Sequence, residues 1–240
     1  MEMKPNVELL CYTDEPERTV ALAARLCYSA VGIAELSERI SDDEVNRLLK
    51  RLLEMGHASP FEHASFTFGV EGISRVTSHQ LVRHRIASYS QQSQRYVRKT
   101  KQFDYVLPPS IRRRKDARER YERLMTELHA LYREFLEAGI AAEDARYILP
   151  GAAETKIVVT MNARELRHFF RQRCCTRAQW EIRKMAELML ERVSEVAPNL
   201  FADCGPPCLV GPCPEGEMSC GRVSSAPSAT RKRPRAHVRR

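Results

Sequence analysis

Residues 155–170 carry the sequence TKIVVTMNARELRHFF, in which a strand pattern passes directly into a helix pattern. The three consecutive β-branched residues at 157–159 predict a strand over Thr155 to Met161 that is buried on both faces. Asn162 with Glu165 three positions later predicts a helix start, because an asparagine side chain there accepts a hydrogen bond from an N–H of the first turn. The residues of this helix that we expect to pack inward are Leu166, Phe169 and Phe170.

The flanking segments add further strands and helices. The clearest helix follows Ser41, which forms a capping box with Glu44, and it ends at Gly56. We expect residues 57–63 to be irregular, since Pro60 interrupts a polar segment. Apolar patterns predict strands at 7–12, 66–70 and 103–107, and helices at 16–29, 73–84, 110–139, 143–149 and 178–197. Together these elements predict a single-domain α+β fold, in which a mixed or antiparallel sheet is flanked by long helices.

The composition is that of a soluble globular protein, with 43% hydrophobic and 29% charged residues among 240. The formal net charge of +8 includes six basic residues at 231–240, so the rest of the chain carries only +2. No apolar run approaches the roughly 18 residues of a membrane span, and residues 1–12 lack the apolar stretch of a signal peptide. We therefore expect a cytoplasmic protein without membrane contact, with a main domain at 1–202 and a basic, disordered tail at 223–240.

Residues 203–222 form a tail rich in cysteine, glycine and proline. Its cysteines are Cys204, Cys208, Cys213 and Cys220. Their spacing is not the paired two-residue spacing of common zinc ribbons, so a structural metal and free thiols both stay open there. His57, Glu62 and His63 likewise lack the i, i+4 histidine pair of a helical zinc motif. We predict no metal site.

Residues 83–96 have the sequence RHRIASYSQQSQRY, which contains no carboxylate. Arginine presents a rigid fork of donors that suits phosphate and carboxylate oxygens, and serine and glutamine can complete the shell around an anion. The residues alone therefore predict an anion site that includes Arg83, Arg85 and Arg95. A surface patch for the backbone of a nucleic acid is an alternative, in which the basic residues 231–240 would take part.

The spacing Arg83-His84-Arg85, seven residues, Ser93 resembles the motif of the flavin-dependent thymidylate synthases, and residues 94–96 are similar to the same family. Other segments that resemble the family are 56–63, 145–150, 162–164 and 178–181 together with Arg173, so the resemblance spans about residues 5 to 220. It implies that the chain methylates dUMP to dTMP. The one-carbon donor would be methylenetetrahydrofolate, and the hydride donor reduced FAD, regenerated by NADPH. A homotetramer with active sites shared between subunits is also implied.

The resemblance further implies which residues hold the ligands. For dUMP these are Gln80, Arg83, Gln91, Gln92, Ser93, Gln94, Arg95, Arg146 and Arg173. For FAD they are His57, Ser59, Arg83, His84, Arg85, Gln91, Asn162, Arg164 and His168. The chain departs from the family at Gln91, where many members carry glutamate, and at His168, where many carry asparagine.

Arg173 is the catalytic residue that the resemblance implies. Its guanidinium keeps its proton at any working pH, so it cannot act as a base, but it can stabilise an anionic uracil. From the residues alone, an ion-paired arginine at a helix end is the alternative. Ser93 has no neighbouring base, so we expect it to make a hydrogen bond to the substrate rather than to attack. The Pro-Cys-His motif of the cysteine-dependent thymidylate synthases is missing, which disfavours thiol catalysis.

Overall fold

Four strands form the central sheet in the order β1-β2-β4-β3. The computed structural model describes residues 2–221, with β1 at Asn6–Tyr12, β2 at Ser65–Ser74, β3 at Ala87–Gln91 and β4 at Glu154–Asn162. Every neighbouring pair is antiparallel, so the sheet is antiparallel rather than mixed. The predicted strands at 7–12, 66–70 and 155–161 are confirmed, whereas β3 lies in the arginine-rich segment, for which we predict no strand.

One face of the sheet forms the core. Its inward side chains include Phe66, Phe68, Ile157, Val159 and Met161, all buried. On the same strand, Lys156 is exposed and Val158 is 39% exposed, so the prediction that residues 155–161 are buried on both faces is wrong. The side chains alternate because an antiparallel sheet can have helices on one face and solvent on the other.

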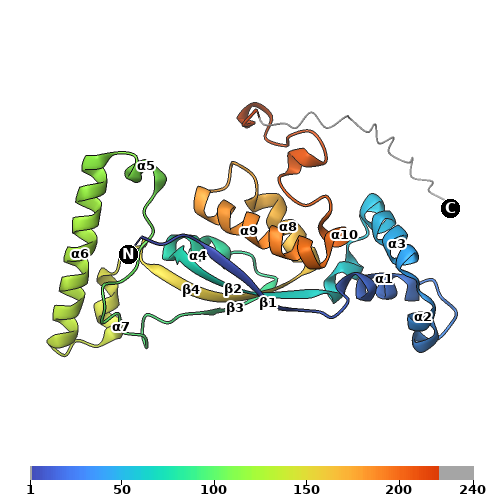
Figure 1. Ribbon diagram of the computed structural model, residues 1–240, viewed down its shortest axis with the longest axis horizontal. Coiled ribbons are helices and arrows are strands. Elements are labelled where there is room, and N and C mark those ends of the chain that lie inside the picture. The colour runs from blue at the N-terminus through green and yellow to red at the C-terminus, as the bar shows by residue number, and fades with distance from the viewer. Residues whose placement is uncertain (1, 222–240) are drawn as a thin grey trace, which may run out of the picture.

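Figure 1 shows helices α4, α8 and α9 over the core face, α1 to α3 at one end of the sheet and α6 standing at the other end. The α-helices are α1 at Pro16–Leu26, α2 at Ile33–Arg39, α3 at Asp42–Met55, α4 at Arg75–Leu81, α5 at Pro109–Arg112, α6 at Lys115–Glu137, α7 at Ala142–Ala145, α8 at Ala163–Arg173, α9 at Trp180–Val196 and α10 at Pro198–Phe201. Short 3-10 helices lie at η1 Ser59–His63, η2 Arg146–Ile148, η3 Pro207–Leu209 and η4 Gly216–Met218. This is the single-domain α+β fold that the sequence predicts.

Two predicted helix starts are confirmed by their capping hydrogen bonds. Ser41 Oγ accepts a hydrogen bond from the backbone N–H of Glu44 at 3.3 Å, and Asn162 Oδ1 accepts one from the N–H of Glu165 at 2.9 Å. Helix α3 ends as predicted at Gly56, whose φ of 73° is left-handed and favours glycine. The start of α8, which carries several site residues, is therefore fixed by its own sequence.

Two predicted elements differ in type. Residues 57–63 contain the 3-10 helix η1 instead of an irregular loop, because Pro60 fits the first turn of a helix, where its missing N–H removes no bond. Residues 103–107 form no strand, and Tyr105 makes only isolated bridges to Glu2 and Ala153. These residues connect the sheet to α5 as an extended segment.

Several predicted helices differ in length. The helix predicted at 16–29 ends at Leu26, and the one predicted at 143–149 is the short α7 followed by η2. The helix predicted at 73–84 begins later, because β2 continues to Ser74, which caps α4 by accepting a hydrogen bond from the N–H of Thr77 at 3.1 Å. Helix α4 ends at Leu81, and the arginine-rich segment then enters the edge strand β3. The helix predicted at 110–139 is divided into α5 and α6, and Arg112 next to the break forms an ion pair with Glu2.

The remaining predictions concern the two ends of the chain. Between residues 2 and 221, no helix is both long and apolar enough to cross a membrane. The predicted disordered tail at 223–240 lies outside the described residues, as does the last residue of the cysteine-rich tail. The described part of that tail, 203–221, contains η3 and η4.

Candidate active site

Helix α8 presents an exposed row of polar side chains. Arg164, His168 and Gln172 are four residues apart, so they follow one another along a single face. Gln172 Nε2 lies 2.9 Å from His168 Nε2, and Arg164 forms an ion pair with Glu62 of η1. At the start of the helix, the amide of Asn162 is only partly used, because its oxygen accepts the capping bond while its NH₂ group stays available.

The side of α8 next to this row holds a buried polar contact. Glu165 and Arg173 are eight residues apart and so share a face, and His84 lies between their side chains. His84 Nδ1 is 3.2 Å from Glu165 Oε1, and His84 Nε2 accepts a hydrogen bond from Arg173 Nε at 3.1 Å. His84 is 5% exposed and Glu165 is 7% exposed. The end of α8 is thereby joined to the segment that follows α4.

Burial decides the protonation of this contact. Desolvation, and then the positive charge of Arg173 and the neighbouring His168, lower the pKa of His84 to about 4, so its ring is neutral near pH 7. Desolvation also lowers the pKa of Arg173, with Arg83 as the second cause, and it raises the pKa of the Glu165 carboxyl. Arg83 is exposed and lies near enough to Arg173 for their charges to repel.

Tyr89 of β3 holds the backbone between α4 and β3. Its hydroxyl donates to the carbonyl oxygens of Leu81 at 2.9 Å and of His84 at 2.8 Å. Burial, and then the charge of Glu165, raise the pKa of this phenol well above its usual range, so it stays a donor. Arg83 and Arg85, which flank His84, are both directed outward as exposed residues.

A second group of candidate residues lies near the start of α4. Arg95 Nε pairs with Glu143 Oε2 at 2.6 Å, and Arg146 Nε donates to the carbonyl oxygen of Glu143 at 3.0 Å. Desolvation, and then the charge of Arg146, lower the pKa of Arg75, the first residue of α4, so these two arginines are neighbours. Arg83 and Arg173 lie instead beyond the last residue of the same helix. The chain therefore holds the four arginines predicted for dUMP in two groups, at opposite ends of α4.

The turn after β3 is held by its own side chains. Gln91 Nε2 donates to Thr155 Oγ1 at 3.1 Å, and Lys99 Nζ donates to Gln92 Oε1 at 3.0 Å. Ser93 Oγ accepts hydrogen bonds from the backbone N–H groups of Arg95 at 3.1 Å and of Tyr96 at 3.3 Å. The hydroxyl proton of Ser93 remains available for a further acceptor. Gln80 and Gln94 are half-buried.

The predicted flavin residues His57 and Ser59 lie just before and at the start of η1, which packs against α8. His57 and Ser59 are exposed, and the pair between Glu62 and Arg164 joins η1 to the helix. The available donors along this side are a hydroxyl, an imidazole, an amide and the guanidinium of Arg164. These groups suit a ligand with phosphates and ring carbonyls, which is the chemistry of a flavin dinucleotide.

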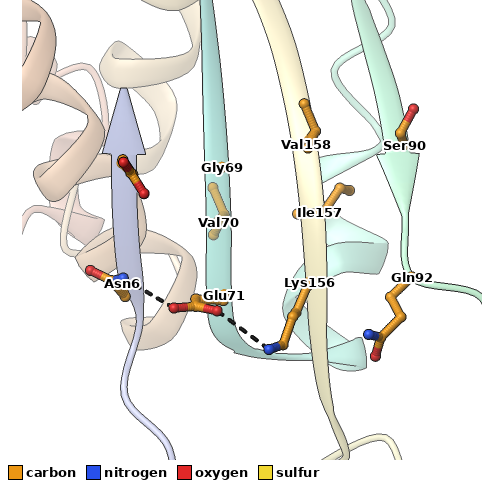
Figure 2. Close-up of a pocket in the computed structure, with 10 residues that line it drawn as sticks. Asn6, Gly69, Val70, Glu71, Ser90, Gln92, Lys156, Ile157 and Val158 are labelled. Atoms are coloured by element: carbon orange, nitrogen blue, oxygen red, sulfur yellow. Dashed lines mark hydrogen bonds and ion pairs between the residues drawn. The ribbon is translucent and has the colours of Figure 1, made fainter. Parts of the chain in front are cut away.

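Figure 2 shows a hollow on the open face of the sheet, lined by residues of all four strands. Asn6 Nδ2 donates to Glu71 Oε1 at 3.2 Å, and Lys156 Nζ lies 3.4 Å from Glu71 Oε2. The acid neutralises the lysine, so the hollow has no excess positive charge for a phosphate. Of the predicted site residues it includes only Gln92.

The cysteines contribute no metal ligands to this site. Within residues 2–221, no group of three or more histidine, cysteine or acidic side chains is arranged to hold a metal ion. Cys175, Cys208, Cys213 and Cys220 line one small cavity beside the end of α8. Burial raises the pKa of the Cys174 and Cys204 thiols to about 12, so both stay protonated at neutral pH.

Comparisons with known proteins agree with the motifs. A family model described as "Thymidylate synthase complementing protein" matches residues 8–199, which is most of the chain. The flavin-dependent thymidylate synthase of Geobacter sulfurreducens is 57% identical over 220 residues, which cover 91% of this chain and 95% of that protein. The chain belongs to the flavin-dependent thymidylate synthases.

Two further relatives support the same family. The flavin-dependent thymidylate synthase of Clostridium tetani is 51% identical over 238 residues, covering 92% of this chain and 95% of that one. Among solved structures, the UMP/dUMP methylase PolB from Streptomyces cacaoi, bound with 5-Br dUMP, superposes with a TM-score of 0.75 at 25% identity, covering 88% of this chain and 100% of that chain.

For this flavin-dependent thymidylate synthase, sequence reasoning missed the acidic partners of three predicted site residues. Glu143 pairs with Arg95, Glu62 pairs with Arg164, and Glu165 contacts His84. A signal for Glu165 exists, because its distance of eight residues from Arg173 places it on the same side of the helix. No comparable spacing indicates Glu143.

Proposed function

We propose that the exposed face of α8 and the segment from Gln80 to Arg95 together bind FAD and dUMP in this enzyme. The enzyme methylates dUMP to dTMP with a one-carbon unit from methylenetetrahydrofolate. Reduced FAD supplies the hydride that completes the methyl group, and NADPH regenerates it. The observation that carries the proposal is the set of partners that bind the Arg173 guanidinium. Its Nε is bound to His84, while within residues 2–221 no carboxylate forms an ion pair with its guanidinium.

Because no carboxylate within residues 2–221 pairs with it, Arg173 is not simply an ion-paired arginine at a helix end. The guanidinium of Arg173 is only partly exposed and keeps its charge, so a nearby anion would gain more from it than from a fully solvated arginine. Placed beside the uracil, Arg173 would stabilise the anionic form of the ring, which raises the electron density at C5 for attack on the methylene carbon. The exposed Arg83 and Arg95 supply positive charge for the phosphate of dUMP.

On the flavin side, we assign hydrogen bonds and charge to exposed and half-buried groups. The exposed ones are His57, Ser59, Arg83, Arg85, Arg164 and His168, and the half-buried ones are Gln91 and Asn162. The ring of His84 is an exception, because both of its nitrogens are engaged inside the protein. We therefore expect no hydrogen bond from the His84 ring to FAD. Its role would be to position Arg173.

The split of the dUMP residues supports a homotetramer with shared sites. Arg95 and Arg146 lie near the start of α4, whereas Arg83 and Arg173 lie beyond its end. A complete site would then combine the first group from one subunit with the second group from another. A stable monomer with full activity would contradict this part of the proposal.

The test of the proposed site is Arg173→Ala, with Arg171→Ala as the matched control at the exposed position two residues earlier. Purified wild-type protein should be yellow with bound flavin and should form dTMP from dUMP, methylenetetrahydrofolate and NADPH. Arg173→Ala should lose about 10²- to 10³-fold in kcat, as when one donor for a developing anion is removed, and should still bind flavin. Undiminished turnover in Arg173→Ala would contradict the assignment.

The alternative function, nucleic-acid binding by the arginine-rich segment and the basic tail, has no support from the comparisons. The tail residues 231–240 lie outside the described residues. Deleting them should leave dTMP formation intact. A nucleic-acid-binding function would instead show as a strongly salt-dependent affinity for polynucleotide that this deletion removes.

A further inference from the structure

Three side chains of α8 contact the ring of His84: Glu165, Phe169 and Arg173. Glu165 and Arg173 approach opposite nitrogens of the imidazole, at 3.2 Å and 3.1 Å. Phe169, midway between them along the helix, packs edge-on against the His84 ring with 4.9 Å between ring centroids. The carboxylate, the histidine and the arginine therefore form a continuous chain from the core to the edge of the candidate site.

The chemistry of the three groups determines where the protons lie. A guanidinium N–H can only donate, so His84 Nε2 must be the acceptor of the bond from Arg173. The proton of the neutral ring is then on Nδ1, where it is donated to Glu165. The opposite tautomer would direct two N–H groups at each other and would leave the buried Glu165 carboxylate without this donor.

We infer that Glu165 is a positioning residue for dUMP methylation, which acts by fixing the tautomer of His84 and through it the orientation of the Arg173 guanidinium. This inference rests on the function proposed for Arg173. Among residues 2–221, no acceptor is bound to the two Nη groups of Arg173, so anchoring at Nε leaves them for the substrate. An arginine with a fixed guanidinium loses less conformational freedom when it binds than one that moves freely.

The surrounding charges make such an anchor necessary. Arg83 repels Arg173, and His168 lies edge-on to His84 with 6.1 Å between ring centroids. Tyr89, on the other element packed here, donates to backbone carbonyls and contributes no charge. Glu165 is the one carboxylate of the described chain that the contacts place against His84. Among residues 2–221, no other side chain accepts from His84 Nδ1–H, so without Glu165 the tautomer that leaves Nε2 free to accept from Arg173 would not be fixed.

The test is a double-mutant cycle of Glu165→Leu and Arg173→Ala, read as the Kd of dUMP by isothermal titration of the FAD-loaded enzyme. Glu165→Leu should weaken dUMP binding about tenfold in the wild-type background and should have no further effect once Arg173 is alanine. An equal loss in both backgrounds would overturn the inference, because it would mean that Glu165 does not act through Arg173.

Two further variants separate positioning from simple destabilisation. Glu165→Gln keeps a carbonyl oxygen that can accept from Nδ1–H, so it should recover most of the affinity and kcat that the leucine variant loses. If the leucine variant does not fold, Glu165→Ala takes its place in the cycle. Glu17→Leu is the matched control, since Glu17 of α1 accepts hydrogen bonds from Asn199 away from this cluster. It should lower thermal stability without changing the Kd of dUMP. A glutamine variant as impaired as the leucine variant would overturn the inference.

The outcome also distinguishes this inference from the function on which it rests. If Arg173→Ala binds and methylates dUMP as the wild type does, the function proposed for Arg173 fails. If Arg173→Ala is impaired but Glu165→Leu is not, only the positioning role of Glu165 fails.

Discussion

Replacing Glu181 should detach the start of α4 from the core helix α9. The Glu181 side chain is buried, with the residue 2% exposed, and its two carboxylate oxygens accept hydrogen bonds from Ser74 N–H at 2.6 Å and from the Ser74 hydroxyl at 2.7 Å. Ser74 in turn caps α4. Glu181→Leu removes both bonds, and since each hydrogen bond to a charged acceptor contributes about 1.5–3 kcal/mol net, the free energy of unfolding should fall by about 3 kcal/mol or more.

Thermal unfolding followed by circular dichroism measures this loss. For a chain of this size, about 3 kcal/mol corresponds to a fall in Tm of about 6–12 °C. Glu181→Gln is the matched comparison, because its carbonyl oxygen can still accept from the N–H of Ser74, and its Tm should fall by less than half as much. A leucine variant that melts within about 2 °C of the wild type would refute the reasoning that this buried carboxylate holds the cap.

The other predictions concern the site arginines and the thiols. Arg95→Ala should leave the Tm nearly unchanged, because an ion pair whose side chains are 53% and 46% exposed contributes at most about 1 kcal/mol, but it should raise the KM for dUMP about tenfold or more if the guanidinium binds the phosphate. An unchanged KM would remove Arg95 from the dUMP site. Native alkylation with iodoacetamide near pH 8, followed by mass spectrometry, should modify the exposed Cys11 and leave Cys174 unmodified, because burial raises the pKa of the Cys174 thiol to about 12. Equal labelling of the two would contradict that burial.

The sequence predicts those helices and strands whose apolar residues repeat at the period of a helix or of a strand. Strand β2 and helix α3 follow from such repeats and from their caps. Strand β3 does not, because its exposed alternate positions are serines and its inward Tyr89 stands among polar neighbours. What makes β3 a strand is pairing with β4, a contact between residues about 70 positions apart that no local pattern contains.

The same distinction applies to the site. The arginine-rich segment and Arg173 can be predicted because their residue types and spacing match a family motif. The spacing of eight residues places Glu165 on the same side of α8 as Arg173, but nothing local shows that this carboxylate is buried against His84. The division of the dUMP residues between the two ends of α4 is likewise a property of the packed chain.

Within residues 2–221, strand β3 is bonded to the sheet along one side only, with β4 as its partner, and it forms part of the segment proposed to bind dUMP. Elements at the rim of a fold open locally at a lower free energy than the whole molecule unfolds. On warming, the proposed dUMP site would therefore lose its shape while the central strands and α9 are still folded. Heat inactivation of this enzyme would begin as reversible fraying, which a nucleotide bound to the segment would delay.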